Sequence, residues 1–464
     1  MSQYEAITLR NFRRVPQVLS SLSEEEKFNI EVVGNVLPFK VNRYVVDELI
    51  DWENHTNDPI YILTFPQKDM LEPGHFQEMA DALVGQASRA ELKLIANKIR
   101  LELNPHPAGQ IEYNMPKFQE VKLKGVQHKY RETMLFFPSQ GQTCHAYCTF
   151  CFRWTQFVGM NDLKFAMKEI QLVIDYLKAS PKVTDVLFTG GDPLIMRTKI
   201  LKGYIEALLD AKIPNLKTIR LGSKALTFHP YRFVTDPDAN ELLRVFEKAR
   251  KSGVHISFMA HFNHPVELHT DIVQQAIERI LHTGAVIRTQ SPIMKNINDQ
   301  ADAWATMWQR QVELGCIPYY MFMARDTGAQ HYFAVTLDNA WKIFKQAYQE
   351  VSGIARTVRG PSMSAGPGKV HIVGISNVGH EKVFVLQFIQ GRNPNWVNQP
   401  FFAKYNPNAI WLDDLVPAFG ESRFFFEEEF PIHRNEKSFS RLDHNMAMPE
   451  NREEILPNSP ILLN

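Results

Sequence analysis

Three of the four cysteines fall within one short run of the chain, TCHAYCTFCF at 143–152. Cys144, Cys148 and Cys151 are separated by three and then two residues. A structural zinc site takes four ligands, commonly from two CxxC pairs, and this chain has no second pair. Three thiolates on a cubane iron–sulfur cluster leave one iron open to a substrate or cofactor. The run therefore predicts metal or redox chemistry at a site with one open position.

A glycine-rich turn, TGGDPL at 189–194, follows the cysteine run along the chain. Gly190 and Gly191 come directly after an apolar segment that is typical of a strand. Glycines in such a turn allow the backbone to approach a ligand closely. Taken alone this pattern is weak, because a glycine turn is more often only a turn.

Short apolar runs that alternate with amphipathic segments predict the element order from about residue 132. Strands rich in apolar and β-branched residues, separated by helices, indicate an α/β fold with a parallel sheet, open or closed into a barrel. Right-handed crossovers then place the carboxyl ends of all strands, where barrel enzymes hold their active sites, on one side. The predicted strands, some with the turn that follows, lie at 134–139, 185–193, 218–223, 255–262, 285–291 and 317–324.

The segments on either side of this α/β unit differ from it in pattern. Residues 1–127 are amphipathic and predict a helical N-terminal region that ends near a linker at 104–109. Apolar residues at helical spacing predict an amphipathic helix over 161–180. The α/β unit spans 128–370. A C-terminal extension, 371–464, contains strand-like VHIVGIS and KVFVLQFIQG, and we expect it to cap the barrel or to form an oligomer contact.

Composition excludes several classes of protein. Lys+Arg and Asp+Glu both number 51, so bulk charge gives no reason to expect a nucleic-acid or membrane-surface partner. No segment has the apolar length of a signal peptide or a membrane span, which predicts a cytoplasmic protein. A clustered set of cysteines in a reducing compartment indicates metal or redox chemistry rather than disulfides, and we expect the isolated Cys316 to be a small buried hydrophobe.

The CxxxCxxC spacing, with Phe150 before the last cysteine, resembles the radical S-adenosylmethionine (SAM) superfamily. Gly190, Gly191 and Asp192 match its motif for the SAM amino group. The segments CxxxCxxCxR, GGDPL, IRLGSK, HFNHPVE, TQSPIMKNIND and IPYY look, in this order, like the lysine 2,3-aminomutase family over roughly 128–390. The resemblance implies a partial (β/α)6 TIM-like barrel of the radical SAM type. It also implies an isomerase that converts an L-α-amino acid to a β-amino acid by 1,2-amino migration, started by a 5′-deoxyadenosyl radical.

The resemblance further implies three cofactors: a [4Fe-4S] cluster on the three cysteines, SAM on its open iron, and pyridoxal 5′-phosphate (PLP). Lys369, in SAGPGKVHI, matches the lysine that forms the Schiff base with PLP, although a GPGK turn with a solvated lysine is the alternative. Tyr130 resembles a residue near the PLP phosphate, where Thr133 replaces an expected arginine. Ser223 and Gln290 match positions close to SAM and PLP.

Substrate contacts are implied in the same way. Arg153 matches the arginine that grips the substrate α-carboxylate, for which its fork of donors is suited. Lysine-specific members place two aspartates around the distal ammonium; the first position is Ser362 here, and the second is Arg325 or Asp326, depending on a one-residue gap. Arg325 with Ser362 would suit an acidic or neutral side chain, whereas Asp326 could hold a cation. No metal role is assigned to the histidines of HFNHP.

The expected partners are an amino acid substrate, an electron donor such as flavodoxin or ferredoxin, and further copies of the chain in a homo-oligomer. The C-terminal cysteines that bind an intersubunit zinc in some relatives are absent, so no zinc is expected. Two alternatives stay open. One is a radical SAM relative with a different substrate or without PLP, and the other is a non-catalytic protein whose cysteines bind zinc for structure.

Overall fold

One large sheet organises the part of the chain that the computed structural model describes, residues 4–104, 114–159 and 165–430. Its eleven strands follow one another in sequence order from β5 to β15. Pairing is parallel from β6 to β12 and antiparallel at both ends. The strands are β5 (Val126–Tyr130), β6 (Thr133–Phe136), β7 (Asp185–Phe188), β8 (Thr218–Ser223), β9 (His255–His261), β10 (Val286–Ile293), β11 (Ile317–Met323), β12 (Arg359–Ser364), β13 (Gly368–Val378), β14 (Glu381–Gly391) and β15 (Pro400–Lys404).

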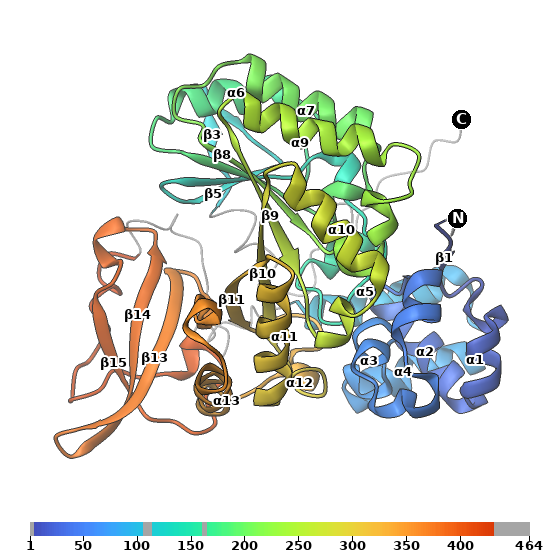
Figure 1. The fold of residues 1–464 in the computed structure, drawn as a ribbon. Helices are drawn as coiled ribbons and strands as arrows, with labels where there is room; N and C mark the ends of the chain where they lie inside the picture. The colour runs from blue at the N-terminus through green and yellow to red at the C-terminus, as the bar shows by residue number, and fades with distance from the viewer. Residues whose placement is uncertain (1–3, 105–113, 160–164, 431–464) are drawn as a thin grey trace.

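Helices connect the parallel strands and lie along one side of them, as Figure 1 shows. Parallel neighbours need such crossovers, because a tight turn can join only antiparallel strands. The blue N-terminal helices and the orange strands β13 to β15 lie at opposite ends of the molecule (Figure 1). The connecting helices are α6 (Ile170–Ala179), α7 (Thr198–Asp210), α8 (Ala225–Phe228), α9 (Ala239–Lys251), α10 (Asp271–His282), α11 (Ala301–Glu313), α12 (Gln330–Phe333) and α13 (Leu337–Gln349).

The predicted α/β fold with a largely parallel sheet is confirmed. Each of the six predicted strands coincides with one of β6 to β11. Among the described residues the two edge strands, β5 and β15, do not pair with each other, so the sheet stays open. One further parallel strand, β12, was not predicted. Its sequence, RGPSMS, is polar and contains a proline, although most of its residues are buried.

The helix predicted over 161–180 is wrong in its first part. The described chain from 165 is not helical until α6 begins at Ile170. Met167 instead forms a parallel bridge with Pro138, donating to the Phe137 carbonyl and accepting from the Ser139 amide at 3.0 Å each. A pairing between distant segments therefore overrides the local helical spacing. Residues 160–164, which held the predicted start, lie outside the described residues.

The two-residue period of the strands separates a packed face from a cavity-lining face. In β8 the residues alternate between partly exposed and buried, with Ile219 and Leu221 fully buried on the packed face. Arg220 and Gly222, which alternate with them, face a cavity. The neighbouring strands repeat this arrangement, so one face of the sheet builds the core under the helices and the other lines a pocket.

The N-terminal region is helical, as predicted, and its helices begin at defined caps. Ser23 and Glu26 form a capping box at the start of α2, and Ser88 and Glu91 form another at α5, which satisfies amides that have no partner inside the helix. The elements are β1 (Ala6–Ile7), α1 (Pro16–Ser21), α2 (Glu24–Val36), β2 (Val41–Asn42), α3 (Pro59–Thr64), α4 (Pro73–Val84) and α5 (Arg89–Glu102), followed by β3 (Lys117–Phe118) and β4 (Val121–Lys122). The predicted linker lies, apart from Asn104, outside the described residues.

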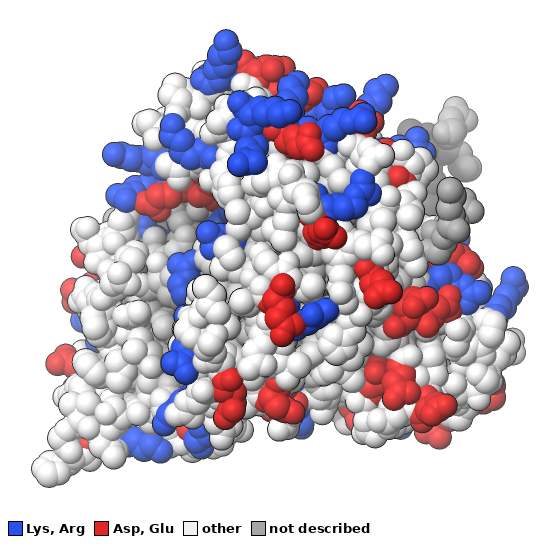
Figure 2. Space-filling model, in the orientation of Figure 1, with Lys and Arg blue, Asp and Glu red and all other residues white. Residues whose placement is uncertain are grey.

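The strand-like C-terminal segments form the hairpin of β13 and β14, which continues the large sheet. The boundary expected between 370 and 371 falls inside β13, and the division into three domains stays a prediction. Figure 2 shows both signs of charge on one face, with Lys and Arg most numerous at the end where α6, α7 and α9 lie. Within the described ranges, no helix has both the length and the apolar character needed to cross a membrane.

Candidate active site

A cavity of about 340 Å³ opens on the face of the sheet opposite the connecting helices. This volume is at the lower end of the range that small-molecule sites occupy. Each of the strands β6 to β11 contributes residues to its wall, and loops at their carboxyl ends complete it. The cavity is therefore where the predicted site residues must meet if they act together.

The cysteine run enters this cavity and is fastened from outside by the N-terminal region. The amide of Tyr147 donates to the Lys40 carbonyl at 2.7 Å, and the amide of Thr149 donates to the Leu63 carbonyl at 2.9 Å. The Lys40 ammonium also donates to the Thr143 hydroxyl at 2.9 Å. These contacts give the helical region a role that its sequence did not reveal, which is to hold the cysteine loop against the sheet.

Cys144, Cys148 and Cys151 all line the cavity with free thiols. Burial is the largest cause that raises the pKa of each thiol, and the mutual proximity of the three groups raises that of Cys144 further. A thiolate, not a thiol, ligates metal, so these groups need a positive partner to ionise. Within the described ranges no group of three or more His, Cys, Asp or Glu side chains is arranged to hold one metal ion. In a cubane cluster each thiolate instead ligates a different iron. Such a cluster suits thiols that are spread around a space and are not directed at one shared ion.

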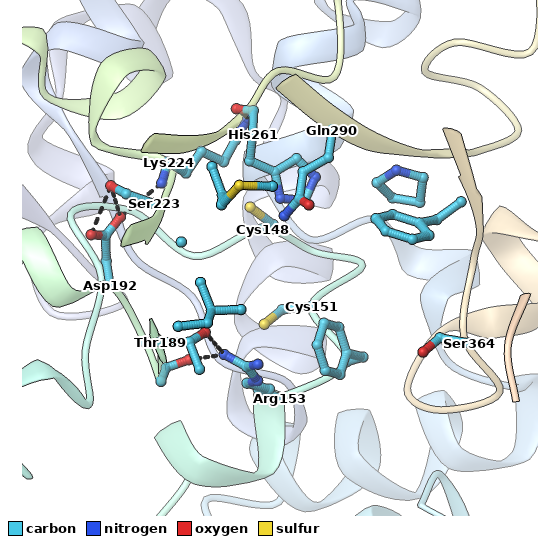
Figure 3. A pocket seen from close by; sticks show the side chains of 18 of the residues that line it. Cys148, Cys151, Arg153, Thr189, Asp192, Ser223, Lys224, His261, Gln290 and Ser364 are labelled. Atoms are coloured by element: carbon cyan, nitrogen blue, oxygen red, sulfur yellow. Dashed lines mark hydrogen bonds between the residues drawn. The ribbon is translucent and has the colours of Figure 1, made fainter. Parts of the chain in front are cut away.

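The glycine-rich turn packs directly against the start of the cysteine run. The Asp192 amide donates to the Thr143 carbonyl at 2.8 Å, and Gly190 has a φ of +140° that favours glycine. The Asp192 carboxylate accepts from the Ser223 hydroxyl at 2.9 Å and from the amides of Leu194 and Lys224 (Figure 3). Asp192 and Ser223 therefore brace the turn, and Gly190 and Gly191 present its backbone to the cavity.

Arg153 projects into the cavity next to the glycine turn, as Figure 3 shows. Its guanidinium donates to the Thr189 hydroxyl at 2.5 Å and to the Gly190 carbonyl at 2.8 Å. It also lies over the Phe152 ring, with Cζ 5.0 Å from the centroid. Both hydrogen bonds use the same terminal nitrogen, so the rest of the fork can meet a carboxylate.

Lys369, at the start of β13, also lines the cavity. Its ammonium nitrogen lies 4.0 Å from the Tyr320 ring centroid and donates to the Gln390 side chain at 3.1 Å. Burial lowers the pKa of Lys369 well below the ordinary range of a lysine, and nearby arginines, Arg220 first among them, lower it further. The neutral form of an amine is the nucleophile, and burial favours that form, so Lys369 is prepared to attack a carbonyl carbon.

Tyr130 reaches the same end of the cavity from β5. Its buried hydroxyl has no hydrogen-bond partner of normal geometry, and burial raises its pKa to about 12. Thr133 also lines the cavity, but its hydroxyl donates to Asp185 at 3.0 Å. The neighbouring Lys129 donates to the carbonyl of Ala365 and has a pKa lowered mainly by burial. Lys129 was not predicted; it belongs to the same β5–β6 hairpin as the threonine that replaced the expected arginine, but it does not line the cavity.

The structure separates the residues predicted for the substrate side chain. Arg325 lines the cavity, with Cζ 4.7 Å from the Phe152 centroid. Asp326, the next residue, does not line it. Ser362 is fully buried within β12, where its hydroxyl donates to the Met321 carbonyl at 3.3 Å, and it does not line the cavity either. Ser364 occupies the wall instead (Figure 3).

Phe150 and Gln290 also line the cavity, and Phe150 packs against His261 with ring centroids 5.7 Å apart. His261 was assigned no role, yet it faces the cavity, and burial lowers its pKa well below the ordinary value. Lys224 was missed as well; it joins the glycine turn to a buried Glu267 at 2.6 Å. Polar residues that interrupt an apolar strand, such as Arg220 in TIRLGS, were the available signal for these positions.

No family model matches the sequence. A protein of Aquifex aeolicus, provisionally named an L-lysine 2,3-aminomutase, is 31% identical over 403 residues, covering 87% of this chain and 94% of that protein. The glutamate 2,3-aminomutase of Clostridioides difficile is 26% identical over 353 residues, covering 76% of this chain and 72% of that protein. Among solved structures, a radical SAM methyltransferase from Sphaerobacter thermophilus is 13% identical, covers 50% of this chain and 68% of that one, and superposes with a TM-score of only 0.36.

Proposed function

The chain belongs to the lysine 2,3-aminomutase family of radical SAM enzymes, and on this premise we propose that it is a PLP-dependent 2,3-aminomutase acting on an L-α-amino acid. Its class is therefore that of an isomerase. The relatives are named after lysine and after glutamate, so similarity alone leaves the substrate side chain open.

One observation carries the proposal: the three free thiols and the buried amine of Lys369 line the same cavity. A cavity shared by a cluster-binding loop and a buried lysine suits chemistries that act on one ligand. The alternative, a solvated lysine in a GPGK turn, is disfavoured because Lys369 is buried, and this burial lowers its pKa.

The residues present fit a [4Fe-4S] cluster with SAM. Cys144, Cys148 and Cys151 would ligate three irons, and Gly190 and Gly191 would offer their backbone to SAM. Phe150 and Gln290 would complete that part of the wall. When bound, the cluster and SAM supply the radical, and PLP carries the migrating amino group. The protein's own part is to hold these groups in one cavity whose apolar lining limits the access of water.

Other residues that line the cavity fit PLP. Lys369 would bind it covalently, because burial favours the neutral form of its amine, which can attack an aldehyde. Tyr130, whose buried hydroxyl lines the cavity near Ser364, would donate a hydrogen bond to the phosphate of PLP. Gln390 holds the Lys369 nitrogen at 3.1 Å and so orients it. Arg153 would bind the substrate α-carboxylate beside the cysteine loop.

The remaining predictions concern partners. An electron donor such as flavodoxin or ferredoxin, a homo-oligomeric state and a cytoplasmic location stay predictions. So does the absence of zinc.

A radical SAM enzyme that acts without PLP is the second candidate, and it differs from the first in one measurable property, the covalent capture of PLP by Lys369.

Anaerobic incubation of the reconstituted, PLP-loaded enzyme with SAM, a reductant and single amino acids tests the proposal. We expect a β-amino acid product together with 5′-deoxyadenosine. Borohydride reduction followed by peptide mass analysis should place PLP on Lys369. Cleavage of SAM with no PLP on that peptide would favour the second candidate, and zinc without iron in the purified protein would contradict both.

A further inference from the structure

The charged side chains that line the cavity are almost all cationic. Asp192 supplies the carboxylate in this wall, and its oxygens already accept hydrogen bonds from Ser223, Leu194 and Lys224. These three donors of the protein therefore already occupy the oxygens that a positive ligand would contact. The basic side chains of the wall are Arg153, Arg220, Lys224, Arg325 and Lys369, and burial lowers the pKa of the last of these.

Two of these cations are satisfied by carboxylates of the protein. Arg220 forms an ion pair with Asp185 at 2.9 Å, and Lys224 forms one with Glu267 at 2.6 Å. Lys369 is assigned to PLP in the proposed function, and its nitrogen is held by Gln390. Arg153 and Arg325 are thus the cavity cations that have no carboxylate within ion-pair distance among the described residues.

Arg325 begins the loop that follows β11, and its guanidinium lies on the Phe152 ring. Burial lowers the pKa of Arg325, while the charge of Asp326 nearby has the opposite effect. Arg325 also contributes to lowering the pKa of Lys369, which shows that its charge acts inside the site. A buried guanidinium that faces a cavity is costly unless an anion meets it there.

Arg153 and Arg325 share one aromatic ring. Their guanidinium carbons lie 5.0 and 4.7 Å from the centroid of Phe152. The distance between the two cations therefore cannot exceed the two ring contacts taken together. Two guanidiniums this close to each other, with no protein carboxylate at ion-pair distance among the described residues, are stabilised by a ligand that brings negative charge to both.

We propose that the substrate is an α-amino acid with an acidic side chain, with Arg153 on its α-carboxylate and Arg325 on its distal carboxylate. This inference rests on the proposed function and adds the substrate class to it. The register left open by the sequence is decided by the cavity, because Arg325 lines it and Asp326 and Ser362 do not. A distal ammonium, as in lysine, would meet Arg325 with no free carboxylate in the wall to pair with it.

Equilibrium binding of amino acids to the PLP- and SAM-loaded, oxidised protein tests the inference without turnover. Calorimetric titrations would compare L-glutamate and L-aspartate with L-glutamine, L-norvaline and L-lysine. We expect at least one acidic amino acid to bind on the order of 100-fold more tightly than glutamine or lysine, as is typical of a buried charge pair. Arg325→Gln should remove this preference, and Arg325→Lys should retain part of it. Arg131→Gln is the matched control, because Arg131 is exposed and paired with Glu132 at 2.6 Å.

Measuring PLP in the same variants shows whether Arg325 binds the distal carboxylate of the substrate or the phosphate of PLP. If Arg325→Gln keeps full PLP on Lys369 and loses only the preference for the acidic ligand, the assignment is supported. If it lowers PLP occupancy and leaves the ratio of glutamate to glutamine affinity unchanged, Arg325 serves the phosphate and the inference is overturned. Equal or tighter binding of lysine or of a neutral amino acid to the wild type would also overturn it. Failure of the wild type to take up PLP at Lys369 would instead refute the proposed function, because that readout precedes any amino acid.

Discussion

Adding one methyl group to the glycine turn should release the cysteine loop. A Cβ on Gly191 would lie 2.4 Å from the Thr143 carbonyl oxygen and 2.6 Å from the Thr143 backbone nitrogen and carbon. Real Cβ atoms essentially never come closer than 3.0 Å, so the backbone before Cys144 must move. The same carbonyl accepts the Asp192 amide at 2.8 Å, and that bond would be strained or lost.

The size of the effect can be worked out from these contacts. Overpacking against backbone costs about 1–3 kcal/mol, and a lost backbone hydrogen bond adds about 1 kcal/mol. The state that holds the cluster would then be disfavoured by about 2–4 kcal/mol, which lowers the apparent affinity for the cluster roughly 30- to 1,000-fold. Gly203→Ala is the matched control, because Gly203 is exposed on α7 with nothing within 4 Å. That change should be neutral or stabilise the protein by about 0.5–1 kcal/mol.

The assay is iron and sulfide content per chain after anaerobic reconstitution, followed during challenge with an iron chelator. Circular dichroism of both variants checks that they are folded. Gly191→Ala should lose iron much faster than the wild type, and Gly203→Ala should not. If Gly191→Ala retained its iron as firmly as the control, the turn would not support the cysteine loop and the reasoning would be refuted.

Three further changes test other parts of the molecule. Glu267→Gln leaves the Lys224 ammonium buried without a counter-charge and should cost about 3–5 kcal/mol of the free energy of unfolding; an unchanged urea midpoint would contradict this. Burial depresses the pKa of Lys369, so between that folded-state pKa and the ordinary value of 10.5 the unfolded chain binds a proton that the folded chain does not. The free energy of unfolding of the cofactor-free protein should therefore rise with pH over this range. Lys369→Met should weaken this rise as the pH approaches 10.5, and an equal rise of the urea midpoint with pH in the two proteins would count against the buried neutral amine. Cys148→Ala should lose iron on reconstitution, whereas Cys316→Ala, at a buried position away from the cavity wall, should keep it; equal iron in the two variants would contradict the ligand assignment.

Apolar patterning predicted the parallel strands because each strand must bury one face under a helix. Phe188 and Leu221 are buried for that reason, and their runs were recognisable in the sequence. The start of α6 was mispredicted because Met167 pairs with Pro138, a contact that helical spacing does not encode. Strand β12 was missed because its sequence is polar. Neighbouring strands bury most of its residues, and no apolar pattern in the sequence indicates that burial.

The candidate site was predictable where residue type and spacing carry the chemistry. Cys144, Cys148 and Cys151 are close in sequence, and the structure places them on one cavity wall with Lys369. The side-chain pocket was not predictable, because a shift of one residue decides whether Arg325 or Asp326 faces the cavity. The hydrogen bond from Lys40 to the cysteine loop was not predictable either. It joins segments that are far apart in the chain, and no local sequence pattern indicates such a contact.

A single-turnover assay that locates the product nitrogen tests the aminomutase assignment itself. The reduced enzyme, loaded with SAM and PLP, is incubated anaerobically with α-¹⁵N-labelled L-glutamate, and the product is analysed by NMR. We expect ¹⁵N on the β-carbon, formed together with 5′-deoxyadenosine and dependent on Lys369 and the three cysteines. Production of 5′-deoxyadenosine while the nitrogen of every amino acid tested stays on its α-carbon would contradict the assignment of this chain as an aminomutase.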